Sequence, residues 1–351
     1  MSSLRSSYKD RKKKVLRSKR LSIGVVFVAL MVAVWVLARD YVYIFRANIK
    51  TPDGKNASLY IPSDADFQYV KNELTSMGVL VNAKAFTWLS KRTDYVNGVH
   101  PGHYSLTDKM TNQELVDMLR FGHQTPVKVV FHNIRNIEQL AGRISKQIEP
   151  DSIEILNAIK DNDSIDATSF IPNTYELYWN TDAESFVERM TTEYDAFWND
   201  TRKQKAISKK LTQREVSILA SIIDKETTKT SEMPRIAGVY LNRLKKRWPL
   251  QADPTLVYAL GDYSIRRVLD VHKEIDSPYN TYKYAGLPPG PICIPSIAAI
   301  DAVQNAENHK YYYFCAKEDL SGYHVFARNI TEHNRNAEKY RKALNKNKIY
   351  K

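Results

Sequence analysis

Two carboxylates stand close together in the segment ILASIIDKETTKT (residues 218–230), and both are candidates for acid–base chemistry. They are Asp224 and Glu226, and apolar residues precede them. Because a helix turns by about 100° per residue, Glu226 should point within ~20° of Leu219, on the apolar face. Asp224 should point ~160° away from Glu226. On one helix the two carboxylates therefore cannot act as a facing pair.

Glu226 is the better candidate for a general acid, because its expected surroundings favour the protonated form. It lies near the C-terminal end of the expected helix, on the side that meets the core. Burial and the negative end of the helix dipole both disfavour the carboxylate, so the pKa should rise. An acid that stays protonated near neutral pH suits general acid catalysis. The alternative is a half-exposed glutamate with no catalytic task.

The segments that follow are dense in neutral hydrogen-bonding and aromatic residues. Sugars are typically bound by such sets, with ring faces on aromatics and hydroxyls on amides. The members are Asn242, Gln251, Thr255, Tyr279, Asn280, Thr281, Tyr282 and Tyr284. The alternative is that Asn280 and Asp253 serve turns and helix caps, in a chain with 22 tyrosines.

His324, His333 and Asn334 form a second polar cluster in the sequence. A third metal ligand is missing, so we expect a substrate contact or a structural hydrogen bond there. The two cysteines, Cys293 and Cys315, do not form a CxxC pair, and whether they are joined is open. We therefore expect no metal and no cofactor.

The N-terminus has the pattern of a membrane anchor. Residues 1–20 hold nine Lys or Arg and one Asp, residues 21–38 are uncharged, and the aromatic-rich YVYIF follows at 41–45. A span needs roughly 20 apolar residues. The positive-inside rule then predicts a cytoplasmic tail at 1–20, a transmembrane helix at 21–45 and the rest outside. A cleaved signal peptide is the alternative, although the run exceeds a typical signal core.

The charge balance does not indicate a nucleic-acid partner. The chain of 351 residues has a net charge of +13, but the basic tail carries most of it. The remaining body is only mildly basic, so we expect no nucleic acid to bind.

Hydrophobic periodicity and turn residues predict a linker and three folded regions after the anchor. Residues 46–57 form a polar linker, and 58–122 have a β-α-α-β-α pattern whose last helix opens with a Thr111–Glu114 capping box. Residues 125–210 begin with a strand and are otherwise mostly helical. The predicted fold class is therefore α+β, with a mixed α/β region at 211–345. Helix caps in that region are expected at Thr212, Ser231, Asp253, Ser296 and Thr331.

From about residue 58 to 345, the sequence resembles the endolytic murein transglycosylases, the MltG or YceG-like family. The matching segments are ASIIDKET, IAGVYLNRL, LQADPTLVYALG, SPYNTYKYAGLPPGPI and YHVFARNITEHNRN. The resemblance implies that 58–122 is a LysM-like subdomain, that Glu226 is the catalytic glutamate and that Tyr279 and Asn280 lie in the substrate groove. Two positions depart from the family pattern. Asp224 stands where glutamate is usual and Ala252 where threonine is usual, which puts a hydroxyl contact at 252 in doubt.

The resemblance implies cleavage of the β-1,4 bond between N-acetylmuramic acid and N-acetylglucosamine without water. Glu226 would protonate the leaving oxygen and then deprotonate the muramic acid 6-hydroxyl, which closes a 1,6-anhydro ring. One carboxylate then serves where ordinary glycosidases need two. The expected partners are peptidoglycan glycan strands and cell-wall synthases of the same membrane. The expected location is the inner (cytoplasmic) membrane of a bacterium, with a single pass and the body in the periplasm or extracytoplasmic space.

Two other functions remain open at this point. The first is a non-enzymatic, wall-binding scaffold. The second is a two-carboxylate glycoside hydrolase, a muramidase, with Asp253 or Asp224 as the base.

Overall fold

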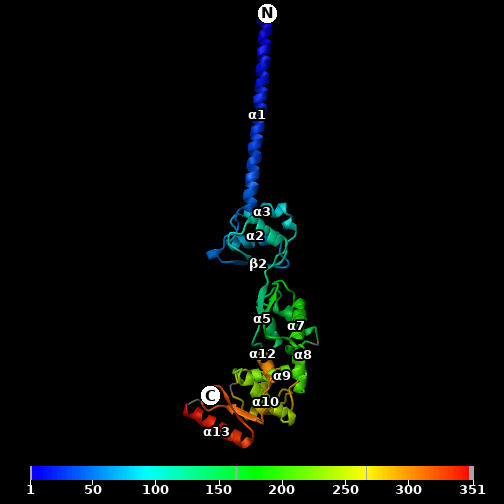
Figure 1. The fold of residues 1–351 in the computed structure, drawn as a ribbon, viewed down its shortest axis with the longest axis vertical. Coiled ribbons are helices and arrows are strands. Elements are labelled where there is room, and N and C mark those ends of the chain that lie inside the picture. Colours follow the sequence, from blue (N-terminus) through cyan, green and yellow to red (C-terminus); the bar gives the residue numbers. More distant parts are fainter. Residues whose placement is uncertain (1, 163–164, 266, 348–351) are drawn as a thin grey trace. The chain divides into compact units, whose positions relative to one another are not determined.

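The computed structural model describes residues 2–162, 165–265 and 267–347. The chain forms two compact units (Figure 1). Unit 1 comprises Met1–Pro126 and Tyr178–Asn180, and unit 2 comprises Val127–Leu177 and Thr181–Lys351. Helices are mixed with antiparallel two-stranded sheets in both units. The predicted combination of helices and strands is therefore confirmed.

Unit 1 begins with a long helix, α1 (Ser2–Phe45). Its segment Ser22–Phe45 is long and apolar enough to cross a membrane, and its apolar side chains are exposed. The predicted apolar helix is thus present. The basic residues 2–20 belong to the same continuous helix, drawn in blue in Figure 1.

The rest of unit 1 confirms the predicted β-α-α-β-α order. Strand β1 pairs antiparallel with β2, with Leu59 opposite Tyr104. Helix α4 opens with the expected capping box of Thr111 and Glu114. The core lies between the sheet and the helices. The elements are β1 (Ala57–Ile61), α2 (Phe67–Ser76), α3 (Ala83–Arg92), β2 (Gly102–Leu106) and α4 (Asn112–Arg120), with short 3₁₀ turns at Pro52–Gly54 and Tyr95–Asn97.

Part of the segment predicted as a polar linker, 46–57, is built into unit 1. Asn48 and Ile49 are almost fully buried, and Ala47 and Ile49 form backbone bridges to Thr111 and Leu80. Because these backbone groups pair with the folded unit, the segment's first half is held in place. The polar composition of 46–57 gave no sign of this pairing.

The first half of unit 2 has its own apolar core. Strands β3 and β4 pair antiparallel, and helices α5, α6 and α7 pack beside them. Ile294, from a distant loop, completes this core. The elements are β3 (Val127–Val130), α5 (Ile137–Ile144), α6 (Ser152–Lys160), a 3₁₀ turn at Ala167–Ser169, β4 (Thr174–Leu177) and α7 (Ala183–Phe197).

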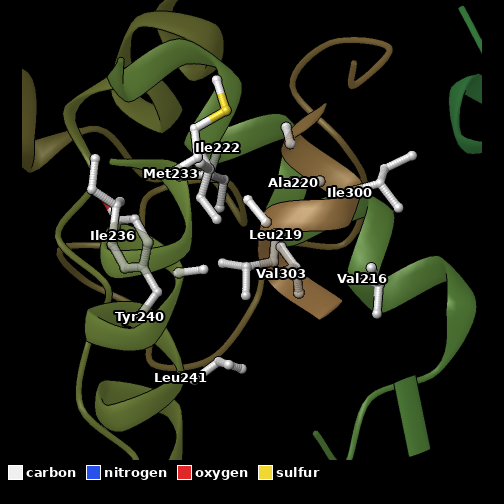
Figure 2. Close-up of a cluster of buried hydrophobic side chains, with 14 of the residues drawn as sticks. Val216, Leu219, Ala220, Ile222, Met233, Ile236, Tyr240, Leu241, Ile300 and Val303 are labelled. Atoms are coloured by element: carbon white, nitrogen blue, oxygen red, sulfur yellow. The ribbon is translucent and has the colours of Figure 1, made fainter. Parts of the chain in front are cut away.

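The second half of unit 2 is built around helix α9, whose apolar side chains meet those of α10 and α12 (Figure 2). Leu219 on α9, Ile236 on α10 and Val303 on α12 are fully buried there. The elements are α8 (Asp200–Ser208), α9 (Gln213–Glu226), α10 (Met233–Lys245), α11 (Asp253–Leu260), a 3₁₀ turn at Asp270–Glu274, α12 (Ile297–Gln304), β5 (Tyr313–Ala316), β6 (His324–Ala327) and α13 (Ile330–Lys346).

Several predicted helix starts shift by one or two residues. Thr212 and Ser296 cap α9 and α12 as predicted. Three other predicted caps are wrong, because the helix begins one or two residues away from the predicted position. The cap residues are Glu232 rather than Ser231, Ala252 rather than Asp253, and Asn329 rather than Thr331.

Candidate active site

The C-terminal residue of α9 is Glu226, and α10 places Tyr240 beside it. The Tyr240 hydroxyl donates a hydrogen bond of 2.5 Å to Glu226 Oε1. Tyr240 is fixed in turn by the apolar core, where its ring contacts Phe314 of β5. Glu226 Oε2 accepts no hydrogen bond from any residue that the structure describes. One carboxylate oxygen is thus held and the other is available to a ligand.

Burial raises the pKa of Glu226 from its ordinary value of 4.5 to about 7. The nearby Asp253 raises the pKa further, whereas the hydrogen bond from Tyr240 and the charge of Arg243 lower it. The rise was predicted from the position at the end of an apolar helix, and it is confirmed. Near neutral pH, Glu226 therefore exchanges readily between its acid and base forms.

Two cavities meet at Glu226. The first, of about 420 Å³, is lined by Glu226 and Asp253 together with Asn133, Arg135, Lys225 and Tyr258. The second, of about 430 Å³, shares Glu226 and Asp253 and adds Tyr240, Gln251, Tyr282 and Tyr313. A chain-like ligand could therefore occupy both cavities with its middle at the carboxylate.

A second carboxylate, Asp253, lines both cavities at the first residue of α11. It accepts a short hydrogen bond from the hydroxyl of Tyr282. The sequence predicted a helix cap at Asp253, with a catalytic base as the alternative. The cap prediction is wrong, because Asp253 is the first residue of α11 and its side chain lines the cavities with Glu226.

Arg243 forms the floor of the second cavity. Its guanidinium donates to the carbonyls of Tyr312 and Leu250, at 2.7 and 2.8 Å. It also donates to the side chain of Gln251 at 3.2 Å. The buried cation thus joins α10 to the segments that carry Gln251 and β5.

Four of the six predicted substrate-binding residues have their polar groups engaged within the protein. The Asn242 amide donates to the carbonyls of His309 and Tyr311. The Asn280 amide donates to the carbonyls of Lys273 and Ile275 in a tight turn. Thr255 and Thr281 are buried and their hydroxyls lie 2.8 Å apart. These residues shape the segments around the cavities, and direct contact with a ligand stays a prediction for them.

The other two predicted residues lie closer to open space. Gln251 is exposed, lines the second cavity and has a left-handed backbone with φ of 52°. The ring of Tyr279 packs 4.7 Å from that of Tyr258, which lines the first cavity. Gln251 thus lines the same cavity as Glu226, whereas Tyr279 packs against a residue that lines the other one.

The two histidines of the second polar cluster also line the second cavity. His324 Nδ1 lies 3.1 Å from Glu232 Oε2, so its partner is a carboxylate at the start of α10. His333 stacks on Tyr313, and burial lowers the pKa of His333.

Within the described ranges, no cluster of three or more His, Cys, Asp and Glu side chains could hold a metal ion. Cys293 and Cys315 are free thiols.

Asp224 points to a different part of the protein from Glu226, as the helical geometry predicted. It accepts a 2.5 Å hydrogen bond from the hydroxyl of Ser296, the cap residue of α12. The half-buried Asp224 ties α9 to α12.

Sequence reasoning missed the contribution of the loop between β3 and α5. Asn133 and Arg135 line the first cavity from this loop, and Gln139 lines it from the first turn of α5. The backbone N–H of Ile294 donates to the carbonyl of Ile134, which fixes the loop against unit 2's Pro/Gly segment. This contact joins residues 160 positions apart, so local spacing could not indicate it.

Comparison with known proteins gives consistent results. An endolytic murein transglycosylase of Bacillus subtilis (strain 168) is 28% identical over 81% of this chain and 84% of its own length. One of Streptococcus pneumoniae (strain R6) is 28% identical over 90% of this chain, which spans about two thirds (64%) of that protein. A solved YceG-like protein of Listeria monocytogenes matches with a TM-score of 0.54 and 27% identity, covering 80% of this chain and 98% of that one. The sequence model of the YceG-like family matches residues 59–339, and the chain therefore belongs to this family.

Proposed function

We propose that this protein is a membrane-anchored lytic transglycosylase that cuts inside peptidoglycan glycan strands. The bond cleaved is the β-1,4 bond between N-acetylmuramic acid and N-acetylglucosamine, and the new ends are 1,6-anhydromuramic acid. The single observation that carries the proposal is the position of Glu226. Its carboxyl, with a pKa near 7, lies where two cavities meet.

The reaction follows from that position. Protonated Glu226 gives its proton to the glycosidic oxygen as the C1–O bond breaks, and an oxocarbenium-like centre forms at C1. The resulting carboxylate then accepts the proton of the muramic acid 6-hydroxyl while that oxygen bonds to C1. Glu226 ends the cycle protonated, and no water is consumed.

Tyr240 and Arg243 are suited to support the carboxylate between these two steps. The Tyr240 hydroxyl donates to Glu226 Oε1, and this hydrogen bond favours the charged form. The charge of Arg243 acts in the same direction. A pKa near 7 lets one group act first as an acid and then as a base.

Asp253 favours a second candidate function, a two-carboxylate muramidase. It lines both cavities with Glu226, so it could activate a water molecule in place of the 6-hydroxyl. The two reactions differ in their products. Hydrolysis leaves reducing ends, whereas transglycosylation leaves anhydro ends.

The anchor supports a location at the cytoplasmic membrane. Ser22–Phe45 is apolar enough to span it, and the nine cations of residues 1–20 favour a cytoplasmic N-terminus. The body would then face the cell wall. Protease added to spheroplasts should remove the body and leave a short fragment; a protected body would contradict this orientation.

Glycan binding by the LysM-like residues 58–122 and an association with cell-wall synthases stay predictions.

The proposal is tested with the full chain in detergent and purified glycan strands. Wild-type protein should shorten the strands from internal positions, and Glu226→Gln should not. A wild-type protein that binds strands without cutting them would favour the wall-binding scaffold instead.

A further inference from the structure

The two cavities that meet at Glu226 differ in their cations. The first is lined by Arg135 and Lys225, both of which are exposed. In the second, Arg243 is buried, and its Nε and Nη1 groups donate to the carbonyls of Tyr312 and Leu250 and to the side chain of Gln251. The exposed cations of the first cavity are therefore more accessible than Arg243 to a charged group of a ligand.

Arg135 and Lys225 are not paired with an acidic side chain in the part of the chain that the structure describes. Arg214, by contrast, forms such a pair with Asp166. The first cavity thus has two cations without an ion-pair partner as well as the carboxylates of Glu226 and Asp253, and the two cations are available to an acidic group of a ligand.

Arg135 is held in place rather than free in solvent. Its guanidinium lies 3.6 Å from the centre of the Tyr263 ring. Its backbone N–H donates to Gln139 Oε1 at 2.7 Å, and the neighbouring Ile134 is buried. Stacking occupies the face of the guanidinium but leaves the in-plane N–H groups free. Those groups match a carboxylate, which accepts two parallel hydrogen bonds.

The proposed substrate carries carboxylates on one kind of sugar only. The glycan backbone of N-acetylated sugars is neutral. Each muramyl residue bears a peptide on its lactyl group, and that peptide holds free carboxylates. The peptide projects away from the sugar ring, so its acidic groups would be met by exposed side chains of a cavity rather than by buried ones.

We propose that Arg135, supported by Lys225, forms a subsite for the peptide carboxylates of a muramyl residue bound in the first cavity. The inference rests on the proposed function and adds to it a preference for strands that carry peptides. Arg135 is in this sense a specificity-determining residue. The reaction itself stays with Glu226.

The test compares two substrates with the full chain in detergent. One is glycan strands with uncrosslinked peptides, and the other is the same strands after an amidase has removed the peptides. Wild-type protein should have a higher kcat/KM on the peptide-bearing strands. Arg135→Gln should lower that kcat/KM roughly tenfold and change kcat/KM on bare strands less than about twofold. Lys225→Gln should act in the same direction with a smaller effect.

Arg143→Gln is the matched control. Arg143 is an exposed cation on α5, beside the same loop, and it does not line the cavity. It should leave the ratio of the two kcat/KM values unchanged. Because a general loss of folding lowers both values together, the ratio separates specificity from stability. Equal kcat/KM on the two substrates for wild type, or an equal loss on both for Arg135→Gln, would overturn the subsite.

A binding measurement separates this inference from the proposed function. The probes are a disaccharide-peptide with free carboxylates and the same compound with its carboxylates amidated. The free form should bind more tightly to wild type, and Arg135→Gln should remove the difference. This outcome does not depend on cleavage, so an inactive wild type would contradict the proposed function alone. Equal binding of the two probes would contradict the subsite alone.

Discussion

Unit 1 and unit 2 each bury polar side chains, and their partners differ. In unit 1, the amide of Asn48 donates to Asn112 Oδ1 at 2.8 Å and to the carbonyl of Asn82 at 3.2 Å. The amide of Asn112 donates to the carbonyls of Tyr43 and Ala85. In unit 2, Glu226 has Tyr240 as its hydrogen-bond partner and faces two cavities.

The comparison distinguishes polar side chains that stabilise the fold, such as the two asparagines, from a polar side chain that is suited to catalysis, such as Glu226. The asparagines are neutral. Asn48 donates to Asn112 and to the cap residue of α3, and Asn112 donates to backbone carbonyls of α1 and α3. These bonds tie the end of α1 to the folded unit. Glu226 is titratable, and one of its oxygens is open to a ligand. A buried polar group is therefore a candidate for catalysis when part of its hydrogen-bonding capacity is left for a substrate.

Replacing Glu226 should give the largest effect. Glu226→Gln should lower kcat by about 10²–10⁴-fold or more, because one group performs both proton transfers. The folded state should be as stable as wild type or more stable near pH 8, because Gln has no charge to bury. Strand digestion and chemical denaturation measure the two effects. An active and folded Glu226→Gln protein would remove Glu226 from the mechanism.

Breaking the asparagine pair should affect stability and spare chemistry. Asn112→Ala leaves Asn48 and two carbonyls without their partner, and should destabilise unit 1 by about 2–4 kcal/mol. Cleavage of soluble strands by the folded protein should change less than about twofold. Hydrogen exchange in 57–120 would report the loss. Asn56→Ala, which removes an exposed bond to Ser105, is the control and should stay within ~0.5 kcal/mol.

The pH dependence should follow Glu226. Only the protonated form can act as the acid, so kcat/KM should fall about tenfold per pH unit above pH 7. Tyr240→Phe removes a hydrogen bond that favours the carboxylate, so the pKa of Glu226 should rise and the fall should begin at a higher pH. If kcat/KM of Tyr240→Phe instead begins to fall at a lower pH than that of wild type, the hydrogen bond favours the protonated form of Glu226, which contradicts its assigned role.

Stability should respond to pH through the same group. The pKa of Glu226 is about 7 in the folded protein and 4.5 ordinarily. Between these values the unfolded carboxyl loses its proton first, so the free energy of unfolding should decrease as pH rises from about 4.5 to 7. Above pH 7 this contribution should be constant. Glu226→Gln should lack the decrease, which denaturation curves at pH 5 and pH 8 can measure.

Asp224 should give the smallest effect. Asp224→Asn weakens its bond to Ser296 without removing it, and should cost about 0.5–1 kcal/mol of stability. Its activity should stay within about twofold of wild type, because Asp224 lies on the face of α9 away from the cavities. Chemical denaturation measures the change in stability, and digestion of glycan strands measures the change in activity. A loss as large as that of Glu226→Gln would place Asp224 in the mechanism.

Local patterns were sufficient for much of the fold. Capping boxes predicted the starts of α4 and α9, and helical spacing predicted which side of α9 carries Glu226. The rise in the pKa of Glu226 followed from the same spacing. These features depend on residues a few positions apart, so the sequence contains them directly.

Contacts between distant segments were not predictable in this way. Asp253 was expected as a helix cap because Asp before Pro is a common start signal. Helix α11 instead begins one residue earlier than predicted, at Asp253 itself, and the Asp253 carboxylate lines the cavities. Arg135 lines the first cavity with Glu226, and the hydrogen bond between Ile294 and Ile134 that fixes its loop joins distant segments, which no local period encodes. The donors that the Asn280 amide uses in its turn were also not evident from the sequence, which left a turn and a substrate contact open for this residue.

The most direct test of the account is the mass of the new glycan ends formed by wild-type protein in water enriched in ¹⁸O. If Glu226 alone carries both proton transfers, the new muramyl ends should be 1,6-anhydro ends, lighter by one water and free of ¹⁸O. Reducing ends that contain ¹⁸O would contradict this account. They would show that water attacks C1, and they would make Asp253 the first residue to examine as its base.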